Sequence, residues 1–439
     1  MYKNLLAPLS VQVEITEACP NQCIHCYNYW RHDDEACDGC AIMQPGQVDY
    51  IMDELERSRV FEVIITGGEP LLNKRALYRM LDRIERLPLL RASINTSLIG
   101  LTGSDVERLG RYSHLVSILT SMMGPTADIH DMVASRKGAF KKTVHGIELL
   151  VQAGLAVSAN MVVSRLNREY ILETAELCKG LGVKMFNATR AASPLNCPDF
   201  SPYALDLQEF RTYLTDLGAA GRASNIPVGV LTVYPMCGVR DINAHSMTFG
   251  RRCSAGVSVA AISATGEFRP CTHVQESAGN IFSEPLTILW GRLLPWRDGS
   301  LIPSTCKTCR ALPLCGGGCR ADSLVVNGSL RAEDPLMQLE DVEAAIAGYR
   351  LEQQKRRREV VIPSILRLNP ELRWRREPIG SVWFLRRCIG IFDSATTGFL
   401  EGLVGKDLSQ TDLKGTISPQ FLIGLVERRI LIAGEGSSA

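Results

Sequence analysis

Residues 19–27 read CPNQCIHCY and directly follow an alternation of apolar and polar residues at 11–15. Cys19, Cys23 and Cys26 are therefore spaced C-x3-C-x2-C. Iron–sulfur clusters are held by cysteine thiolates, and three thiolates leave one iron of a cubane without a protein ligand. A zinc knuckle or a chance group of cysteines is the alternative, but zinc sites more often contain a C-x2-C pair alone. The stretch predicts an iron–sulfur cluster with an open iron after the first strand.

The composition is that of a folded protein with two or three domains. The chain has 439 residues, of which 46% are hydrophobic and 22% charged. The net charge of +1 gives no sign of attraction to nucleic acid or to a membrane surface. We see no signal peptide and no membrane-spanning run, so we expect a cytoplasmic protein. Fifteen cysteines in such a chain favour metal ligation over disulfides.

The first half of the chain alternates short β-rich runs with longer helical patterns. This alternation predicts an α/β fold with a parallel sheet and crossover helices, and six such units make a partial (β/α)6 TIM-like barrel. In βα folds the functional residues gather at the carboxyl ends of the strands, which is where the cysteine stretch lies. We expect strands at 11–15, 61–65, 91–95, 115–119, 155–163 and 183–187, and helices at 48–57, 74–87, 143–153 and 168–181.

The second expected strand ends in TGGEP at residues 66–70. Gly67 and Gly68 allow the backbone to come close to a ligand, although an ordinary strand-to-helix turn is the alternative. The cysteine stretch, the aromatic Tyr27 after it and this GGEP sequence together resemble the radical S-adenosylmethionine (SAM) superfamily. That resemblance implies that the three cysteines hold a [4Fe–4S] cluster that binds SAM, and that Gly67, Gly68 and Glu69 bind the SAM amino group.

The same resemblance implies four further SAM contacts: Asn95, Ser121, Asn160 and Arg190. The first three lie at or near the ends of the third, fourth and fifth expected strands. Met123 stands where relatives carry an aspartate. For each of these residues an ordinary polar strand end or turn former is the alternative, and Arg190 could instead bind the substrate or a carboxylate at the end of the barrel.

A second cysteine system follows residue 216. Cys253 is followed by the pattern Gly266-x4-Cys271. Gly266 lies in the turn of an expected hairpin, whose strands are at 257–262 and 268–269. A run C-x2-C-x5-C-x3-C then places Cys306, Cys309, Cys315 and Cys319, with three glycines in the last gap that allow the backbone to wrap tightly. This arrangement resembles the SPASM extension of radical SAM enzymes that modify peptides, which holds two auxiliary [4Fe–4S] clusters.

By that resemblance Cys253, Cys271 and Cys319 hold the first auxiliary cluster, with Cys237 as the candidate fourth ligand. The three cysteines at 306–315 hold the second. The final cysteine of the SPASM pattern is absent. Either Asp334 or Asp322 is an oxygen ligand in its place, or the second cluster is incomplete. One or two structural zinc sites are the alternative for this region.

Cys37 and Cys40 lie in an acidic loop that contains glycine. They could bind zinc, form a labile disulfide or be incidental surface thiols, and the sequence leaves these three interpretations open.

The end of the chain carries no catalytic motif. Residues 341–360 predict a helix with a solvated basic end. Short strands and then two helical patterns follow, which predicts a small α+β, winged-helix-like domain. This tail resembles the PqqD-like domains that bind a leader peptide by adding it as a strand to a sheet edge. A dimerisation or capping domain is the alternative.

The resemblances divide the chain into a radical SAM barrel (1–215), a SPASM domain (216–340) and a C-terminal domain (341–439). They imply a maturase that takes hydrogen from a ribosomally made precursor peptide and forms a carbon–carbon or thioether crosslink. A precursor peptide with a leader and an electron donor such as flavodoxin or ferredoxin are the implied partners. A sulfatase-maturase-like enzyme is one alternative. A non-catalytic iron–sulfur electron carrier or a zinc-binding protein is the other.

Overall fold

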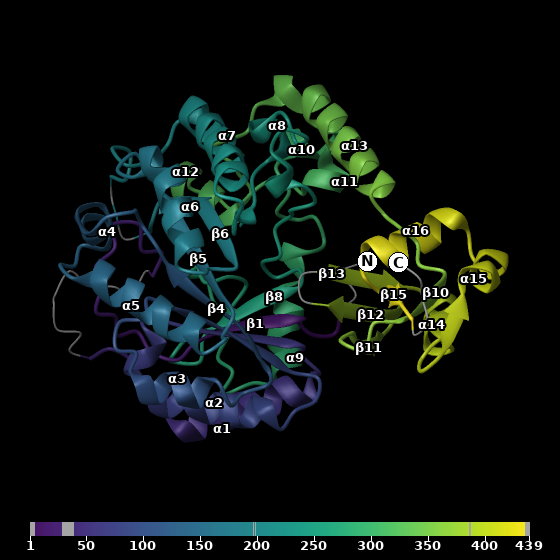
Figure 1. Ribbon diagram of the computed structural model, residues 1–439, viewed down its shortest axis with the longest axis horizontal. Coiled ribbons are helices and arrows are strands. Elements are labelled where there is room, and N and C mark those ends of the chain that lie inside the picture. The colour runs from purple at the N-terminus through teal and green to yellow at the C-terminus, as the bar shows by residue number, and fades with distance from the viewer. Residues whose placement is uncertain (1–4, 29–38, 196, 198, 386–387, 435–439) are drawn as a thin grey trace.

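The computed structural model describes residues 5–28, 39–195, 197, 199–385 and 388–434. Within these residues the central feature is a nine-stranded sheet in the order β7-β6-β5-β4-β3-β2-β1-β8-β9. Helices lie around the outside of this curved sheet, and the C-terminal strands form a separate body beside it (Figure 1). No helix in the described residues is both long and apolar enough to cross a membrane.

The six expected barrel strands are all present. Each strand pairs in parallel with the next one along the chain, so the partial (β/α)6 barrel is confirmed. The strands are β1 (Ser10–Glu14), β2 (Glu62–Thr66), β3 (Arg91–Thr96), β4 (Leu115–Ser121), β5 (Val157–Val163) and β6 (Met185–Arg190). The helices are α1 (Pro45–Arg57), α2 (Lys74–Glu85), α3 (Gly103–Leu109), α4 (Ala127–Ala134), α5 (Ala139–Gln152), α6 (Ile171–Gly180) and α7 (Leu207–Ala223).

Helix α2 illustrates why these segments fold as they do. Leu77, Leu81 and Ile84 recur at helical spacing and are buried, and each such side chain contributes about 1.5–3 kcal/mol when removed from water. Asn73 caps the helix by accepting a hydrogen bond from the backbone of Ala76. Its amide nitrogen donates to the carbonyls of residues 15 and 43, so the helix start is fixed to the carboxyl end of β1.

The sheet extends beyond the six expected strands. β7 (Val228–Gly229) pairs with β6, and β8 (Val259–Ile262) pairs in parallel with β1. The expected hairpin is confirmed, because β9 (Phe268–Arg269) pairs antiparallel with β8. Without β8, the strand β1 would be an open edge with unpaired backbone groups. The first part of the cysteine-rich region is therefore continuous with the barrel sheet.

The rest of the cysteine-rich region consists of short helices (Figure 1). They are α8 (Met236–Val239), α9 (Leu286–Arg292), α10 (Ser304–Lys307), α11 (Leu312–Cys315) and α12 (Arg320–Asn327). The expected helix near 341–360 is α13 (Val342–Arg358), which packs against α8.

The C-terminal segment folds as expected into an α+β unit with its own hydrophobic core. One sheet has the order β14-β10-β15 and the other β11-β12-β13. The strands are β10 (Ile365–Leu368), β11 (Arg373–Glu377), β12 (Gly380–Leu385), β13 (Cys388–Phe392), β14 (Asp407–Ser409) and β15 (Leu431–Ala433). The helices are α14 (Ser394–Glu401), α15 (Gln410–Thr416) and α16 (Pro419–Glu427).

A buried arginine holds this C-terminal unit against the barrel. The guanidinium of Arg375 donates to Oε1 of Glu377 over 2.6 Å, and Oε2 of Glu377 accepts from the backbone of Leu6 over 2.8 Å. Arg375 and Glu377 are both buried. The same guanidinium also donates to four backbone carbonyls of the barrel, those of Ala7, Pro8, Ser58 and Arg59.

We expect Arg375→Met to lower the free energy of unfolding by roughly 3–5 kcal/mol, because it leaves Glu377 buried without its cation. Equilibrium urea unfolding measures this loss. The matched control is Arg376→Met on the same strand, because Arg376 is exposed and its ion pair with Glu401 is worth about 1 kcal/mol or less. Equal losses in the two variants would contradict this role of Arg375.

Candidate functional site

The loop with Cys19, Cys23 and Cys26 begins where β1 ends, as predicted. Helix α4 holds this loop from one side. The backbone N–H groups of Gln22 and Ile24 donate to the last carbonyls of α4 over 3.0 and 3.3 Å. The side chain of Cys23 packs against a small apolar cluster that includes residues of α4 and α5. Backbone contacts of the protein therefore define the shape of the loop.

The three thiols lie close enough to influence one another. Shielding from water raises the pKa of Cys19, and repulsion from the neighbouring Cys23 and Glu69 raises it further, with a smaller effect of Cys26. A metal centre relieves such repulsion, because it binds the thiolate forms. Thiolates are the soft ligands that iron–sulfur clusters use. The donor set of this loop therefore fits the [4Fe–4S] cluster that the sequence predicts.

Gly67 and Gly68 approach the cysteine loop itself. The N–H of Gly68 donates to the carbonyl of Thr16 over 2.7 Å. A Cβ on Gly67 would lie 2.4 Å from the Thr16 oxygen, and one on Gly68 would lie 2.2 Å from the Ala18 oxygen. Gly67 also has φ +139°, which disfavours other residues. The sequence predicted that these glycines make room for a ligand, whereas the structure shows that they make room for the backbone of the loop.

Glu69 joins the carboxyl ends of β2 and β3. Its carboxylate is fully buried and accepts two hydrogen bonds at each oxygen. The donors are the hydroxyl groups of Thr96 and Ser97 and the N–H groups of Leu71 and Ser97. Burial raises the pKa of Glu69, and these bonds oppose that rise. A carboxylate has about four acceptor positions. Glu69 therefore has a clear structural role. Its implied contact with the SAM amino group stays a prediction.

The structure brings Asn95, Ser121 and Asn160 to one face of the sheet. Asn95 pairs with Leu119 and Ser121 pairs with Asn160. Because side chains alternate along a strand, Leu119 and Ser121 share a face, and the two asparagines share it with them. Asn160 also accepts a hydrogen bond from Thr189 of β6 over 2.9 Å. These polar residues therefore form a row near the carboxyl end of the barrel.

Arg190 has a carboxylate partner within the protein. Its guanidinium forms a buried ion pair with Oδ2 of Asp322 in α12. The second oxygen of Asp322 has no hydrogen-bond partner among the described residues and is buried. Of the interpretations of Arg190, binding to a carboxylate at the end of the barrel is therefore the one that the structure realises. The pair joins the barrel to the cysteine-rich region.

An aromatic contact links the first cysteine loop to the second cysteine system. Tyr27 follows Cys26 and stacks on His273, two residues after Cys271, with ring centroids 4.3 Å apart. Burial lowers the pKa of His273 to about 4, so this imidazole is neutral at pH 7. The sequence reasoning did not identify His273, and its position two residues after a predicted ligand is the signal that could have found it.

The later cysteines form two separate groups. In the first group, the pKa of Cys271 and that of Cys319 are raised, chiefly by burial, and Cys253 raises both further. These are the three cysteines that the sequence assigned to the first auxiliary cluster. The N–H of His273 donates to Sγ of Cys271 over 3.5 Å.

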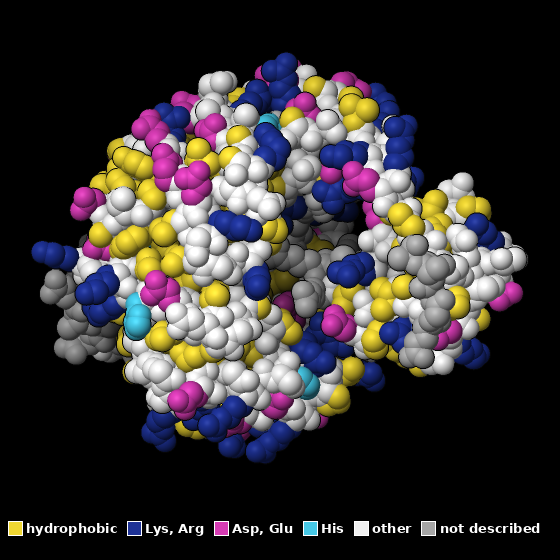
Figure 2. Space-filling view, viewed as in Figure 1, with side chains coloured by type: hydrophobic (Ala, Val, Ile, Leu, Met, Phe, Trp, Pro, Cys, Tyr) yellow, Lys and Arg dark blue, Asp and Glu magenta, His cyan; other side chains and the backbone are white. Residues whose placement is uncertain are grey.

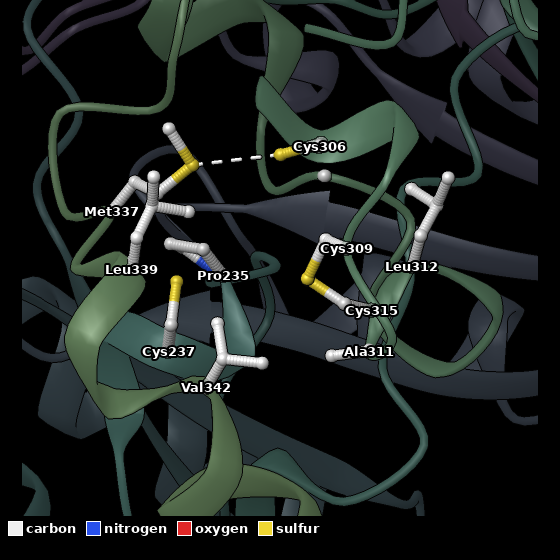
Figure 3. A pocket seen from close by; sticks show the side chains of 11 residues that line it. Pro235, Cys237, Cys306, Cys309, Ala311, Leu312, Cys315, Met337, Leu339 and Val342 are labelled. Atoms are coloured by element: carbon white, nitrogen blue, oxygen red, sulfur yellow. Dashed lines mark hydrogen bonds between the residues drawn. The ribbon is translucent and has the colours of Figure 1, made fainter. Parts of the chain in front are cut away.

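The second group lines a hollow that also contains Cys237 (Figure 3). Cys237, Cys306, Cys309 and Cys315 point into it, and the other lining residues are apolar apart from Gly317: Pro235, Ala311, Leu312, Met337, Leu339 and Val342. About 320 Å³ of space free of atoms lies in and in front of the hollow, open solvent included. Helix α8 therefore places Cys237 beside the second group, whereas the sequence assigned it to the first.

Asp334 does not line this hollow. Its two carboxylate oxygens accept from the N–H groups of Cys319 and Leu336 over 2.7 and 2.9 Å. Burial raises the pKa of Asp334 to about 6. The carboxylate also lies against the turn at 316–318, where three successive glycines have positive φ. Asp334 stabilises that turn, and a role as an oxygen ligand of the second cluster is not supported by its position.

Among the described residues, no three His, Cys, Asp or Glu side chains are arranged to hold a single metal ion. Cys40 is disulfide-bonded. This agrees with the disulfide interpretation of its loop, whereas Cys37 lies outside the described residues.

A space-filling view shows a hollow between the barrel and the C-terminal unit (Figure 2). Lys and Arg side chains gather around it on this face. Positive charge there favours the approach of negatively charged groups of a ligand.

Comparison with known proteins agrees with this geometry. Residues 13–178 match the model of the radical SAM superfamily. The chain is 25% identical over 338 residues to the AdoMet-dependent heme synthase of Oleidesulfovibrio alaskensis. The aligned region covers 74% of this chain and 85% of that protein. It is 25% identical over 364 residues to mycofactocin maturase MftC of Mycobacterium tuberculosis, with coverage of 79% and 87%. Streptococcus suis SuiB bound to precursor peptide SuiA has the same fold, with a TM-score of 0.62, 19% identity and 76% coverage of each chain.

We expect Gly68→Ala to lower the free energy of unfolding by roughly 1–3 kcal/mol, because its Cβ meets a backbone oxygen of the cysteine loop and forces the two segments apart. Chemical denaturation measures the change. Gly46→Ala in α1 is the matched control, since a Cβ there meets nothing within 4 Å. A stability of Gly68→Ala equal to that of the control would show that the loop tolerates the displacement.

We expect the free energy of unfolding to fall between pH 6.5 and pH 4 because of His130. Burial lowers the pKa of His130 to about 4, and its Nδ1 accepts a hydrogen bond from the N–H of Met123 over 3.2 Å. The unfolded chain, with a histidine pKa of about 6.5, binds a proton in this range that the folded chain does not. Stability is therefore complete above pH 6.5 and is lost as the pH falls toward 4, by up to about 3 kcal/mol.

The test compares unfolding curves of wild type and His130→Asn across this pH range. Asparagine keeps an acceptor but does not titrate, so the variant should show a smaller slope against pH. His145→Asn on an exposed side of α5 is the control. An identical slope in wild type and His130→Asn would refute the assignment.

Proposed function

This chain carries a radical SAM domain, and from that premise we propose that it is a peptide maturase. It would take hydrogen from a ribosomally made precursor peptide and leave a carbon–carbon or thioether crosslink. The observation that carries the proposal is the three-cysteine loop at the end of β1 together with two further groups of buried or half-buried cysteines. The relatives named as a mycofactocin maturase and a PqqA peptide cyclase support a peptide as substrate.

Cys19, Cys23 and Cys26 would hold the [4Fe–4S] cluster, and the row of Asn95, Ser121 and Asn160 would contact SAM beside it. When bound, these groups would supply the radical chemistry that removes a hydrogen atom from an unactivated carbon of the peptide. The contribution of the protein is to orient the peptide and to exclude water and competing reactions. The half-buried Tyr27–His273 stack would form one side of this enclosure.

The C-terminal unit is the proposed binding site for the leader of the precursor. Strand β13 ends its three-stranded sheet among the described residues, so its outer backbone groups can pair with an added strand. Phe392 of β13 and Phe421 of α16 meet edge to face at 6.2 Å in the core of this unit, which fixes β13 to α16. We propose flavodoxin or ferredoxin as the electron donor and the cytoplasm as the location.

A second candidate substrate is a tetrapyrrole. It is favoured by the similarity to AdoMet-dependent heme synthase, which is as identical to this chain as the mycofactocin maturase is. The heme synthase match covers 74% of this chain and the maturase match 79%.

The test uses anaerobically reconstituted enzyme with SAM, dithionite and either a small peptide encoded beside this gene or a heme precursor. We expect about twelve irons per chain, falling to about eight in the Cys19→Ala/Cys23→Ala/Cys26→Ala variant, since each cubane carries four. We expect 5′-deoxyadenosine and a peptide lighter by two hydrogen atoms. One hydrogen leaves on 5′-deoxyadenosine, and the other leaves as a proton to water and an electron that an auxiliary cluster would accept.

The triple variant should form neither product. Turnover of the heme precursor with no change in the peptide would favour the second candidate. About four irons in wild type, with zinc in the later cysteines, would overturn the peptide-maturase proposal.

A further inference from the structure

We propose that Cys237 is the fourth thiolate ligand of the auxiliary cluster held by Cys306, Cys309 and Cys315. This cluster is then closed to other ligands, and the group of Cys253, Cys271 and Cys319 is left with three thiolates. The inference rests on the proposed function only in taking the two cysteine groups to hold iron–sulfur clusters. It replaces the carboxylate that the sequence suggested with a cysteine that precedes the whole C-x2-C-x5-C run.

The position of Cys237 in the hollow carries this assignment. Figure 3 shows Cys237 across the hollow from Cys309 and Cys315, with Cys306 nearer to Met337. The sulfur atoms of the cysteines and of Met337 are the side-chain donor atoms that line it, because the remaining lining side chains are apolar. A cluster in this hollow therefore meets four thiolates and no carboxylate.

Backbone hydrogen bonds to sulfur connect the two sides of the hollow. The N–H of Met236, next to Cys237, donates to Sγ of Cys315 over 3.4 Å. The N–H of Gln338, next to Met337, donates to Sγ of Cys237 over 3.4 Å. Hydrogen bonds to the sulfurs are one of the means by which proteins set the potential of a cluster. Cys237 and Cys315 thus share the environment expected of ligands to one cluster.

Helix α8 is fixed in the position that this role requires. Arg211 donates to the carbonyls of Cys237 and Gly238 over 3.3 and 2.9 Å, and it pairs with Asp341 over 2.6 Å. A Cβ on Gly238 would lie 2.4 Å from the carbonyl oxygen of Leu336. The thiol of Cys237 is therefore held in place by contacts that do not involve a metal.

Asp334, Met337 and Asp322 are the other candidates for the fourth ligand of this cluster. Asp334 uses both oxygens on backbone N–H groups outside the hollow. Met337 offers a thioether, which is neutral, and it lies 3.5 Å from Sγ of Cys306. Asp322 is paired with Arg190, and its electrostatic effect on Cys319 places it with the first group.

The test adds Cys237→Ala to two backgrounds of the full-length reconstituted enzyme. One background lacks the second group (Cys306→Ala/Cys309→Ala/Cys315→Ala) and the other lacks the first (Cys253→Ala/Cys271→Ala/Cys319→Ala). Each background should lose about four irons. The readouts are iron and zinc content and the electron paramagnetic resonance spectrum of the reduced clusters, which do not require turnover.

We expect Cys237→Ala to change the spectrum in wild type and in the background without the first group. In the background without the second group it should change neither the spectrum nor the iron content, because its cluster is already absent. In the background without the first group, Cys237→Ala should also make the remaining auxiliary cluster respond to added imidazole. Cys237→Ser, which nearly preserves the side-chain volume, guards against a folding defect.

The opposite pattern, a spectral change only where the first group remains, would overturn the assignment and return Cys237 to that group. No change in any background would show that Cys237 is not a ligand. Zinc in place of iron in wild type would overturn the proposed function as well, and metal analysis separates that outcome from the other two.

Discussion

The structure depends on the close approach of one glycine pair to the cysteine loop. The N–H groups of Gly68 and Glu69 donate to the carbonyls of Thr16 and Ala18, both over 2.7 Å, and a side chain at Gly67 or Gly68 would collide with those carbonyls. Glu69 carries the connection on to β3 through four hydrogen bonds. The carboxyl ends of three adjacent strands and the loop that would hold the metal are thus one unit, which explains why a GGEP sequence accompanies the cysteines.

Three kinds of contact attach the second cysteine system to this unit. Strand β8 pairs with β1, the buried Arg269 of β9 pairs with Glu14 at the end of β1, and His273 stacks on Tyr27. The backbone, an ion pair and an aromatic contact therefore fix the loop of Cys271 beside the first cysteine loop. Because the two loops belong to one sheet, the orientation of one metal centre toward the other is set by the fold.

The relatives of this chain carry names from two chemical classes. Relatives of equal identity carry the names of a heme synthase and a peptide maturase, although both align with about three quarters of this chain. We propose that residues outside the barrel select the substrate. The C-terminal unit is the strongest candidate, because Arg375 holds it to the barrel and the strand edge of β13 is available.

The sequence by itself determined the barrel strands, the hairpin, the α+β tail and the cysteines, because alternation and short spacings report local geometry. It did not determine which distant groups meet. Cys237 of α8 meets cysteines of α10 and α11, Arg190 meets Asp322 of α12, and Asp334 meets the backbone of Cys319. Each of these contacts depends on how helices pack on a finished sheet. Sequence spacing carries no information on contacts made by segments so far apart in the chain, and only the tertiary structure decided them.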